Sequence, residues 1–428
     1  MPVIERLRAR EILDSRGRPT VWASCKLSGR EPCSTSVPSG ASTGRAEAHE
    51  LRDGDARRYR GLGCRKAVAN INDELNGLLS RRSFESQSDL DHALIDIDST
   101  PNKSRLGANA LLAVSLSFAR SMAASSGIPL WKYFAGLVHA DPRTFPRLTI
   151  NLFSGGRHAG SQVAIQDVLL VPSSAQSIDE SLAMTYDVYH SAADLVKQRY
   201  GMRLLRADEG GLAPPFRTSE EMIEAAMHAI QKAGYLPGKD FRLAIDVAAS
   251  EFYCSNRYNL DGEELDPPAM IERLVCWIDR YPIVSVEDGL SQEDWQHWPH
   301  LKRAIAARSL IVGDDLLCTN VGRIRRAIDT GAANALLLKL NQVGTLTEAA
   351  DAYRMARSAR WAVSISVRSG ETEDDWAADL AVGWQGDQFK NGSITQSERL
   401  AKYNRLLAIE QETKWPFINW PETGSSER

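Results

Sequence analysis

The sequence predicts an α/β protein: a TIM-type barrel with an atypical antiparallel start, of the ββαα(βα)6 kind, preceded by a smaller N-terminal α+β cap domain. Short apolar runs recur between residues 148 and 366, and helical stretches separate most of them. This is the pattern of parallel strands that are buried on both faces. The chain has 428 residues, and a barrel needs roughly 250, so a second module is expected.

Composition limits the class of protein. Hydrophobic residues make up 43% and charged residues 25% of the chain, as in ordinary globular domains. The net charge of −4 gives no basic field for nucleic acid. The first ten residues lack the apolar core of a signal peptide, and no run reaches transmembrane length. We therefore expect a cytoplasmic protein that binds a small molecule rather than nucleic acid or a membrane.

Cysteine spacing excludes two further classes. The six cysteines are scattered without C-x-x-C spacing, which argues against a zinc site and against a disulfide scaffold.

The N-terminal segment predicts a small sheet. Residues 4–13 and 20–27 have strand composition and are separated by a turn at 14–19. Segment 34–44 is rich in small and hydroxyl residues. Such a segment is typical of a flexible loop, or of a lid that closes over a site.

A helical region and a boundary follow. Helical periodicity extends over 62–136 with a break at 100–102. The pattern then lapses at 137–147, which contains two prolines. We therefore expect the cap domain at 1–138 and the barrel domain at 139–428.

Seven apolar runs are the expected barrel strands. They lie at 148–152, 168–171, 243–247, 283–286, 310–312, 335–338 and 362–366. Helices are expected at 219–233, 268–279, 321–330 and 346–359. The connection between the first two strands, 153–167, is Gly-rich and too short for a long helix. The barrel is therefore expected to open with antiparallel strands instead of a βα unit.

Four of these strands end in a charged residue. Asp246, Glu287 and Asp314 end three successive strands and Lys339 ends the next, at spacings of about one βα unit. Because the carboxyl ends of barrel strands meet at one mouth, the three acids should form an oxygen-ligand cluster for a hard cation such as Mg²⁺. Each acid alone could instead cap the following helix. Repetition at three consecutive strands favours the metal site.

Further motifs stand where the loops of the barrel mouth are expected. They are 155–160 with His158, Gln166-Asp167, Asp208-Glu209-Gly-Gly, Val367-Arg368-Ser369-Gly-Glu, Phe389-Lys390-Asn-Gly, Ser39-Gly-Ala-Ser-Thr-Gly in the cap, and Ser397-Glu-Arg-Leu-Ala-Lys-Tyr-Asn near the end. In their order along the chain, and together with the strand-end acids, these motifs resemble those of the enolase family from about residue 5 to 410. The resemblance implies a carbon–oxygen lyase of the phosphopyruvate hydratase type.

The resemblance also implies a role for the charged residues of the mouth. Asp246, Glu287 and Asp314 would bind one Mg²⁺, and Ser39 on the lid would bind a second that arrives with the substrate. Lys339 would be the base that removes the C2 proton of 2-phosphoglycerate.

Other residues are implied on the acid side and in substrate binding. Glu209 would assist departure of the C3 hydroxyl, with Asp167 as a second pocket acid. The implied substrate-binding residues are Lys390 for the carboxylate, Arg368 and Ser369 for the phosphate, and His158 and Gln166 in the pocket.

The implied chemistry suits these residue types. Removing a proton beside a carboxylate creates a dianion that only concentrated positive charge can stabilise. Two metal ions and Lys390 would supply that charge. The same cations would lower the pKa of Lys339 by like-charge repulsion, which leaves some neutral amine to act as the base.

Each residue taken singly has a simpler interpretation. Lys339 could extend to solvent from a barrel end, and Arg368 could pair with a structural acid such as Glu371 or Glu373. His158 could hydrogen-bond its own loop. The ordered set of motifs favours the functional interpretation.

Several positions differ from the family pattern close to the expected pocket. Val367 stands where the family has His, Asp167 where it has Glu, and Ser154 where it has Asn. Gly289 replaces Pro, and Ala207 replaces Gly. Valine cannot donate, accept or titrate. The change to Asp167 withdraws a carboxylate by about an ångström, enough to matter for a positioned acid.

The expected subunit contact has changed as well. Trp22 and Ala408 stand where the family has a Glu–Arg pair that joins subunits, whereas Arg10 and Glu398 of a second pair remain. We therefore expect a homodimer with a more apolar contact around Trp22.

Three functions follow, in order of preference. The first is an Mg²⁺-dependent lyase that forms phosphoenolpyruvate from 2-phosphoglycerate, or acts on a close analogue. The second is a relative from phosphonate antibiotic metabolism, such as a carboxyphosphonoenolpyruvate synthase, with weak or no hydratase activity. The third is a non-catalytic binding protein of the same fold, which retention of Lys339, Lys390 and Glu209 argues against.

Overall fold

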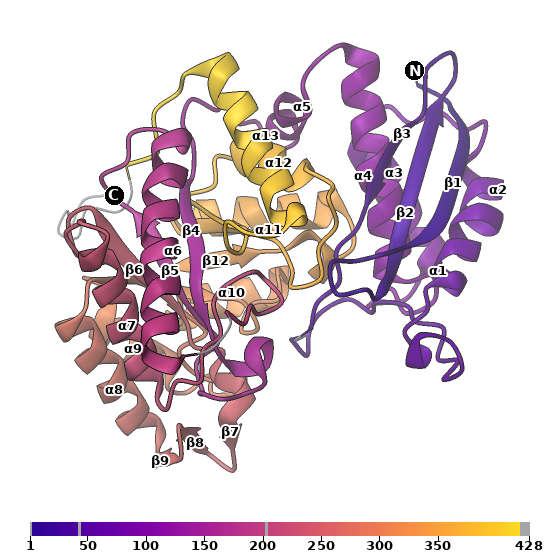
Figure 1. The fold of residues 1–428 in the computed structure, drawn as a ribbon. Helices are drawn as coiled ribbons and strands as arrows, with labels where there is room; N and C mark the ends of the chain where they lie inside the picture. Colours follow the sequence, from indigo (N-terminus) through magenta and orange to yellow (C-terminus); the bar gives the residue numbers. More distant parts are fainter. Residues whose placement is uncertain (1, 42–43, 202–203, 420–428) are drawn as a thin grey trace.

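The computed structural model describes residues 2–41, 44–201 and 204–419 and has two parts, a cap and a closed barrel (Figure 1). In the cap, three antiparallel strands lie in the order β1-β2-β3: β1 (Ile4–Leu13), β2 (Pro19–Leu27) and β3 (Cys33–Ser36). The helices of the cap are α1 (Arg65–Ala69), α2 (Asn76–Leu79), α3 (Gln87–Asp98), α4 (Ala108–Ser126) and α5 (Leu130–Leu137). The predicted α+β cap is confirmed.

Local sequence explains the two longer cap helices. Ser86 and Asp89 form a capping box that fixes the start of α3, since each side chain accepts the backbone N–H of the other. Helix α4 is rich in Ala, Leu and Ser and is buried along most of its length. It packs against β2 and β3 and ends at Gly127, whose φ of 65° few other residues adopt readily.

The barrel closes in the order β4-β5-β6-β10-β11-β12-β13-β14 and back to β4. Its strands are β4 (Arg147–Ser154), β5 (Asp167–Pro172), β6 (Phe241–Asp246), β10 (Ile283–Glu287), β11 (Leu310–Gly313), β12 (Ala335–Leu338), β13 (Ala362–Ser366) and β14 (Gln388–Lys390). Both β4–β5 and β5–β6 are antiparallel, and the remaining pairs are parallel. The antiparallel start predicted from the short connection is confirmed.

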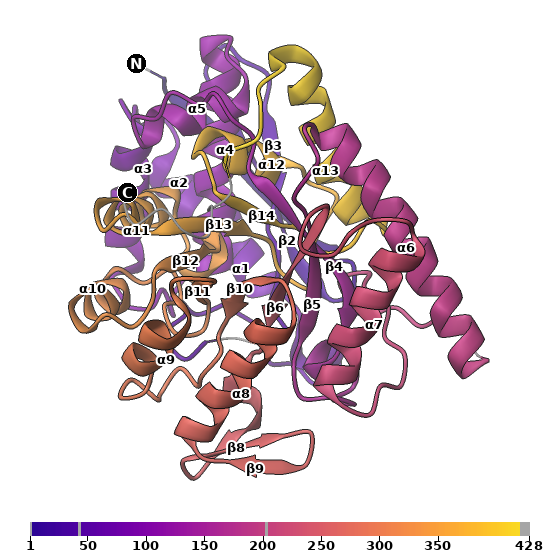
Figure 2. The ribbon, with the colours of Figure 1, turned by 90° about the vertical axis from the view of Figure 1, so that its left-hand side faces the viewer.

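Helices cover the outside of the barrel (Figure 2). They are α6 (Ile178–Tyr200), α7 (Ser219–Lys232), α8 (Pro267–Arg280), α9 (Trp298–Ile305), α10 (Val321–Thr330), α11 (Leu346–Ser358), α12 (Trp376–Gly383) and α13 (Ser397–Thr413). A small sheet of β7 (Tyr253–Cys254), β8 (Arg257–Leu260) and β9 (Glu263–Leu265) lies between β6 and α8 in the chain. Alternating residues of each strand pack inside the barrel and beneath the helices, which is why the strands appear as continuous apolar runs.

Strands β3 and β14, besides the three strands of the small β7–β9 sheet, lie outside the sequence-based assignment. Strand β3 occupies the start of the segment expected as a loop, where Ser34 and Thr35 pair with β2. Strand β14 has three residues, too few to show a strand pattern. Each forms because a neighbouring strand offers unpaired backbone groups; for β14 one such neighbour, β4, is distant in sequence.

Contacts between cap and barrel join Ser39 to the loop that follows β13. Ser39 and Gly370 exchange two backbone hydrogen bonds, of 2.8 and 3.0 Å. On another face, Asp91 of α3 accepts hydrogen bonds from the backbone N–H and hydroxyl of Thr347 in the first turn of α11. The cap is thus joined to the barrel by polar contacts that fix its position beside the strand ends.

Among the described residues, no single helix is long and apolar enough to span a membrane; α4 and α5 pass that test only together, across a bend of 110°. The six cysteines all lie in the described part and are free.

Candidate active site

Strand pairing brings the predicted residues to one mouth. The register of β6 sets Asp246 beside Glu287 of β10 on one side and beside Asp167 of β5 on the other. Lys390 ends β14, across the barrel from β6. Residues that are far apart in sequence meet because β6, β10 and β14 end, and the antiparallel β5 begins, at the same mouth.

Lys390 joins two of the predicted metal ligands. Its Nζ lies 2.7 Å from Asp246 Oδ2 and 2.7 Å from Glu287 Oε2, and all three side chains are buried. Burial alone would lower the pKa of Lys390, but the charges of Asp246 and Glu287 raise it well above its ordinary value. Gln166 Nε2 donates to the same Asp246 oxygen at 2.9 Å. Gln166 therefore orients a predicted metal ligand in this structure.

Lys339 pairs with the third predicted ligand. Its Nζ lies 2.5 Å from Asp314 Oδ2, and Gln342 Nε2 donates to Asp314 Oδ1 at 2.8 Å. The Lys339 and Asp314 side chains keep 12% and 13% of their surface exposed, so they face the open mouth. Gln342 was missed from the sequence because it lies in a short 3₁₀ turn after β12, with no motif of its own.

The lysine and aspartate of this pair shift each other's pKa. Burial would raise the pKa of Asp314, but the charges of Lys339 and Arg368 lower it overall. Burial would lower the pKa of Lys339, but Asp314 raises it overall. The sequence analysis expected bound cations to lower the pKa of Lys339. The protein groups alone raise it.

The donor set fits a hard divalent cation. Asp246, Glu287 and Asp314 all offer carboxylate oxygens, and in the structure each is paired with the positive charge of a lysine. Glu287 Oε1 is buried and accepts no hydrogen bond from the described residues. A buried carboxylate oxygen without a donor is expected where a metal ion would be bound.

Asp288 is a further acid of the mouth. Oxygens of Asp288, Asp314 and Asp315 lie within 4.8 Å of one another and could hold a metal ion. Asp288 also accepts backbone hydrogen bonds from Asp314 and Asp315, at 3.1 and 2.7 Å. It thereby fixes the turn that presents Asp314, and its place directly after Glu287 was the only signal for it in the sequence.

Arg368 lies on the cap side of the mouth. Its Nη1 is 2.9 Å from Glu47 Oε2, and its Nη2 is 3.3 Å from Glu47 Oε1. The alternative that Arg368 pairs with an acid is therefore right, but the acid is Glu47 of the cap. Glu371 instead accepts the backbone N–H of Arg368 at 3.2 Å. The guanidinium is thus held at the mouth by a carboxylate that the sequence did not indicate.

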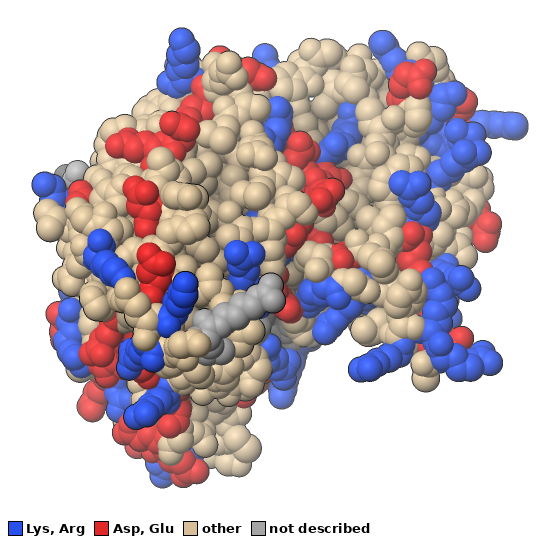
Figure 3. Space-filling model, in the orientation of Figure 1, with Lys and Arg blue, Asp and Glu red and all other residues tan. Residues whose placement is uncertain are grey.

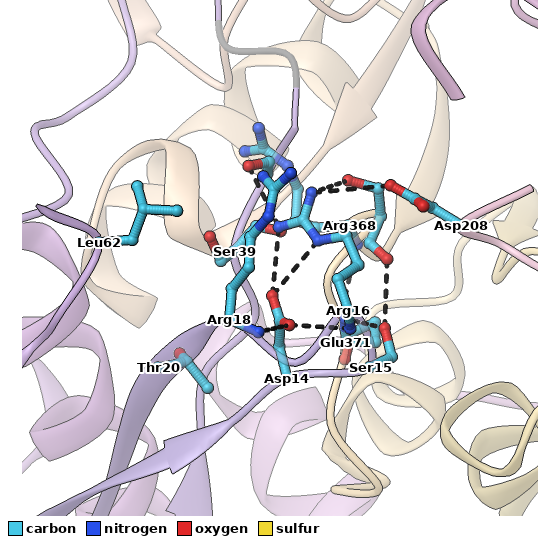
Figure 4. Close-up of polar contacts among 12 residues, drawn as sticks. Asp14, Ser15, Arg16, Arg18, Thr20, Ser39, Leu62, Asp208, Arg368 and Glu371 are labelled. Carbon is cyan, nitrogen blue, oxygen red and sulfur yellow. Dashed lines mark hydrogen bonds and ion pairs between the residues drawn. The ribbon is translucent and has the colours of Figure 1, made fainter. Parts of the chain in front are cut away.

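The turn between β1 and β2 reaches the same place (Figure 4). Arg16 donates to Ser369 Oγ at 3.0 Å and to the Ser39 backbone oxygen at 2.9 Å. Asp14 accepts from the guanidinium of Arg16 and from the backbone N–H of Arg18, which keeps the turn closed. Arg16 therefore adds a second guanidinium beside the predicted phosphate-binding pair.

The Ser39 hydroxyl points to other cap residues. It donates to Glu50 at 3.2 Å and accepts from Arg52 at 2.7 Å. No described contact joins it to Asp246, Glu287 or Asp314. Its role as a ligand of a second metal ion stays a prediction.

The 397–404 motif supports the Arg368–Ser369 loop from behind. Arg399 is fully buried and donates to the backbone oxygens of Arg368 and Ser369, both at 2.8 Å. Lys402, also buried, lies 3.0 Å from Glu371. Arg399 and Lys402 are buried behind the loop that carries Arg368 and Ser369, and their contacts fix that loop.

Two further acids, Glu209 and Asp167, also lie near Lys390. Asn151 Nδ2 donates to Glu209 Oε2 at 3.0 Å, and Ser154 Oγ donates to Asp167 Oδ1 at 2.5 Å. All four side chains are buried, and the charges of both acids contribute to the raised pKa of Lys390. The predicted acids are thus brought together with the predicted carboxylate-binding lysine. The His158 side chain lies outside the described residues.

Comparison with protein families agrees with this arrangement. Residues 4–134 match the model of the enolase N-terminal domain, and residues 142–415 match that of the enolase C-terminal TIM barrel domain. The chain belongs to the enolase family. It is accordingly an enolase-superfamily enzyme, of a family that typically uses Mg²⁺, and its buried acids suit that ion.

Two departures from the enolase pattern contact each other. Ser154 and Asp167, which replace Asn and Glu, face each other across β4 and β5 and share the 2.5 Å hydrogen bond. Val367 is also buried, at the end of β13 beside Arg368. Two of the changes in this enolase relative, Ser154 and Asp167, thus form a contacting pair on the acid side, whereas Val367 lies beside Arg368 and Gly289 lies two residues after Glu287.

The expected subunit contact lies on the face between cap and barrel. Acidic side chains gather there (Figure 3), and a hollow of about 520 Å³ is lined by Trp22, Glu371, Asp374 and Glu398 among others. The guanidinium of Arg10 stacks 4.4 Å above the Trp22 ring. The homodimer stays a prediction.

Proposed function

We propose that this protein is an Mg²⁺-dependent lyase that removes the C2 proton of 2-phosphoglycerate, or of a close analogue, and eliminates water to give phosphoenolpyruvate or its analogue. One observation carries the proposal: the carboxylates of Asp246, Glu287 and Asp314 share the barrel mouth with the ammonium groups of Lys339 and Lys390. A site for proton removal beside a carboxylate needs this combination of metal ligands, base and fixed cation.

The three carboxylates would hold the tightly bound ion. A bound Mg²⁺ would stabilise the negative charge that develops on the substrate carboxylate. Lys390 is a buried cation beside two of these carboxylates and would bind that same substrate carboxylate. Engagement of Asp314 by a cation would weaken the interaction that raises the pKa of Lys339.

Lys339 would accept the C2 proton. Of the two lysines it is the more exposed, at 12% against 8%, and it faces the mouth through which a substrate enters. Arg368 and Ser369, with Arg16 beside them, would bind the phosphate as a bidentate guanidinium site. The base and the anion site thus lie on the cap side of the mouth.

Glu209 would donate a proton to the departing C3 hydroxyl, with Asp167 as the second acid. Both are near Lys390, so a substrate whose carboxylate binds Lys390 would present C3 to them. Two departures from the enolase pattern, Asp167 and Ser154, lie on this side of the site.

A second candidate function is favoured by those departures. Val367 offers no polar group in a buried position, and Ser154 holds Asp167 toward β4. An enzyme of phosphonate metabolism, such as a carboxyphosphonoenolpyruvate synthase, would need the same metal site and base with an altered acid side.

One experiment separates the candidates. The purified protein is incubated with Mg²⁺ and 2-phosphoglycerate in deuterated buffer, and phosphoenolpyruvate and deuterium at C2 are followed by NMR. Rapid formation of both supports the first function. Exchange at C2 with little phosphoenolpyruvate supports the second. Absence of both, with Mg²⁺ bound, contradicts the proposed lyase.

A further inference from the structure

Strand β4 contains a bulge next to the acid side. Asn151 pairs with Leu169 of β5, and Ser154 pairs with Asp167, so three steps along β4 match two steps along β5. The register shifts between Asn151 and Phe153. In a regular strand, residues three apart point to opposite faces; one extra residue brings them to the same face.

That shared face is the inside of the barrel. Leu169 and Val171 of β5 pack with Ala244 and Val284 in the barrel interior, and Asp167 is on the same alternation. Asn151 and Ser154 lie opposite Leu169 and Asp167, so both point inward at the mouth. Each then donates to one acid: Asn151 to Glu209, and Ser154 to Asp167.

The surroundings leave little freedom for these side chains. A Cβ at Gly211 would lie 2.5 Å from Ser154 Oγ and 3.5 Å from Asn151 Cβ, so glycine is needed for the Glu209 loop to lie against β4. The loop is also tied to the strand by backbone hydrogen bonds between Ser154 and Leu212, at 2.9 Å, and between Leu212 and Leu152, at 2.8 Å. The bulged strand and the acid-bearing loop therefore form one unit.

We infer that Asn151 and Ser154 are positioning residues for the water-eliminating step, brought to one face by the bulge of β4 so that Asn151 orients Glu209 and Ser154 orients Asp167. This inference rests on the proposed function of the two acids. A carboxyl group whose oxygen accepts a hydrogen bond from a buried donor is fixed in direction, and a group that transfers a proton must be fixed in direction to act. Lys339 and the anion site make no described contact with either residue.

The test compares Asn151→Ala and Ser154→Ala with Thr149→Val. Thr149 is the matched control because it lies on the same strand, is equally buried, and donates to the backbone oxygen of Phe389 instead of to an acid. Water elimination and deuterium exchange at C2 are measured for each protein. We expect kcat for elimination to fall about 10- to 100-fold in the two alanine variants. In both alanine variants the KM and the C2 exchange rate should stay close to the wild-type values. The Thr149→Val protein should match the wild type in all these measurements.

Two outcomes would overturn the inference: an unchanged kcat in either alanine variant, or an equal fall in exchange and elimination. A crystal structure of Ser154→Ala adds a measurement that is independent of activity. The Asp167 carboxylate should leave its wild-type orientation, and an unmoved carboxylate contradicts the inference. If the wild-type protein exchanges no C2 proton, the proposed function fails, and the crystal structure alone decides whether Ser154 positions Asp167.

Discussion

In the cation-binding half of the site, Asp246, Glu287 and Asp314 are paired with the ammonium groups of Lys390 and Lys339. In the acid half, Glu209 and Asp167 accept hydrogen bonds from the neutral side chains of Asn151 and Ser154. Loss of one partner of a buried ion pair leaves an uncompensated charge and costs about 3–5 kcal/mol. Loss of one neutral donor to a charged acceptor costs less, about 1.5–3 kcal/mol.

This difference bears on which residues depart from the family pattern. Asp167 and Ser154 lie in the acid half, Val367 lies beside Arg368, and Gly289 follows Asp288, whereas every predicted metal ligand and both lysines are retained. The cation-binding half is a connected set of buried charges, so a change of one member affects the others. The acid half can change one residue at a time, and Ser154 with Asp167 shows two changes that fit each other.

The largest expected effect is on Lys339. Lys339→Ala should lower the rate of C2 exchange by about 10²- to 10⁴-fold, the usual contribution of a general base. Exchange into deuterated buffer, followed by NMR, measures this rate. Lys339→Arg is the matched control, because it keeps a positive charge beside Asp314 but cannot release a proton near neutral pH. It should be equally inactive, and retained exchange in either variant would remove Lys339 from the role of base.

The second effect tests whether the acid half is damaged or reshaped. If Val367 and Asp167 merely impair an ordinary enolase, Val367→His with Asp167→Glu should raise phosphoenolpyruvate formation by about 10²-fold or more. We expect a much smaller gain, because Ser154 already holds the shorter Asp167, as a pocket reshaped for another group would require. Phosphoenolpyruvate formation by the wild type and by the double variant is compared after circular dichroism shows that both are equally folded. Adding Ser154→Asn to the double variant tests whether residues 154 and 167 must change together. A full gain from the double variant alone would support the ordinary enolase.

The third effect separates the two halves by metal binding. Mg²⁺ at 100 times its Kd should stabilise the folded protein by about 2.7 kcal/mol, seen as a rise in Tm. Asp246→Ala should remove most of that rise, since it deletes a ligand and leaves Lys390 with one carboxylate. Ser154→Ala, in the acid half, should keep it. An equal rise in wild type and Asp246→Ala would contradict the assigned ligand.

The smallest effect is the pH dependence of metal binding. Burial, with the charge of Asp246, raises the pKa of Glu287 above its ordinary value, so protons compete with Mg²⁺ at a higher pH than at an ordinary glutamate. Affinity should therefore fall as the pH falls, by at most about tenfold per pH unit for one proton. Calorimetric titration at several pH values measures this slope. Glu287→Gln should bind more weakly with a flatter slope, and a steeper slope in that variant would exclude Glu287 as the competing group.

The sequence by itself determined the barrel and most of its mouth. Apolar runs ended by Asp246, Glu287, Asp314 and Lys339 predict strands whose ends meet, because in a barrel of parallel strands the carboxyl ends share one edge. The short connection before Asp167 predicts an antiparallel start, because chain length limits which crossovers are possible. These features are local in the chain, so a single sequence suffices to find them.

Tertiary structure decided which side chains fix the positions of the site residues. Glu47 binds Arg368, Asp288 fixes the turn of Asp314, and Asn151 and Ser154 reach the two acids. The contacts of Glu47 and Asn151 join elements far apart in the chain. Those of Asp288 and Ser154 join neighbouring strand ends, and none of the four leaves a periodic signal. The bulge in β4 shows the reason most clearly: the spacing of Asn151 and Ser154 predicts opposite faces, and only the register against β5 turns both inward. Side-chain direction there is set by pairing with a neighbouring strand, which is a property of the fold and not of the segment.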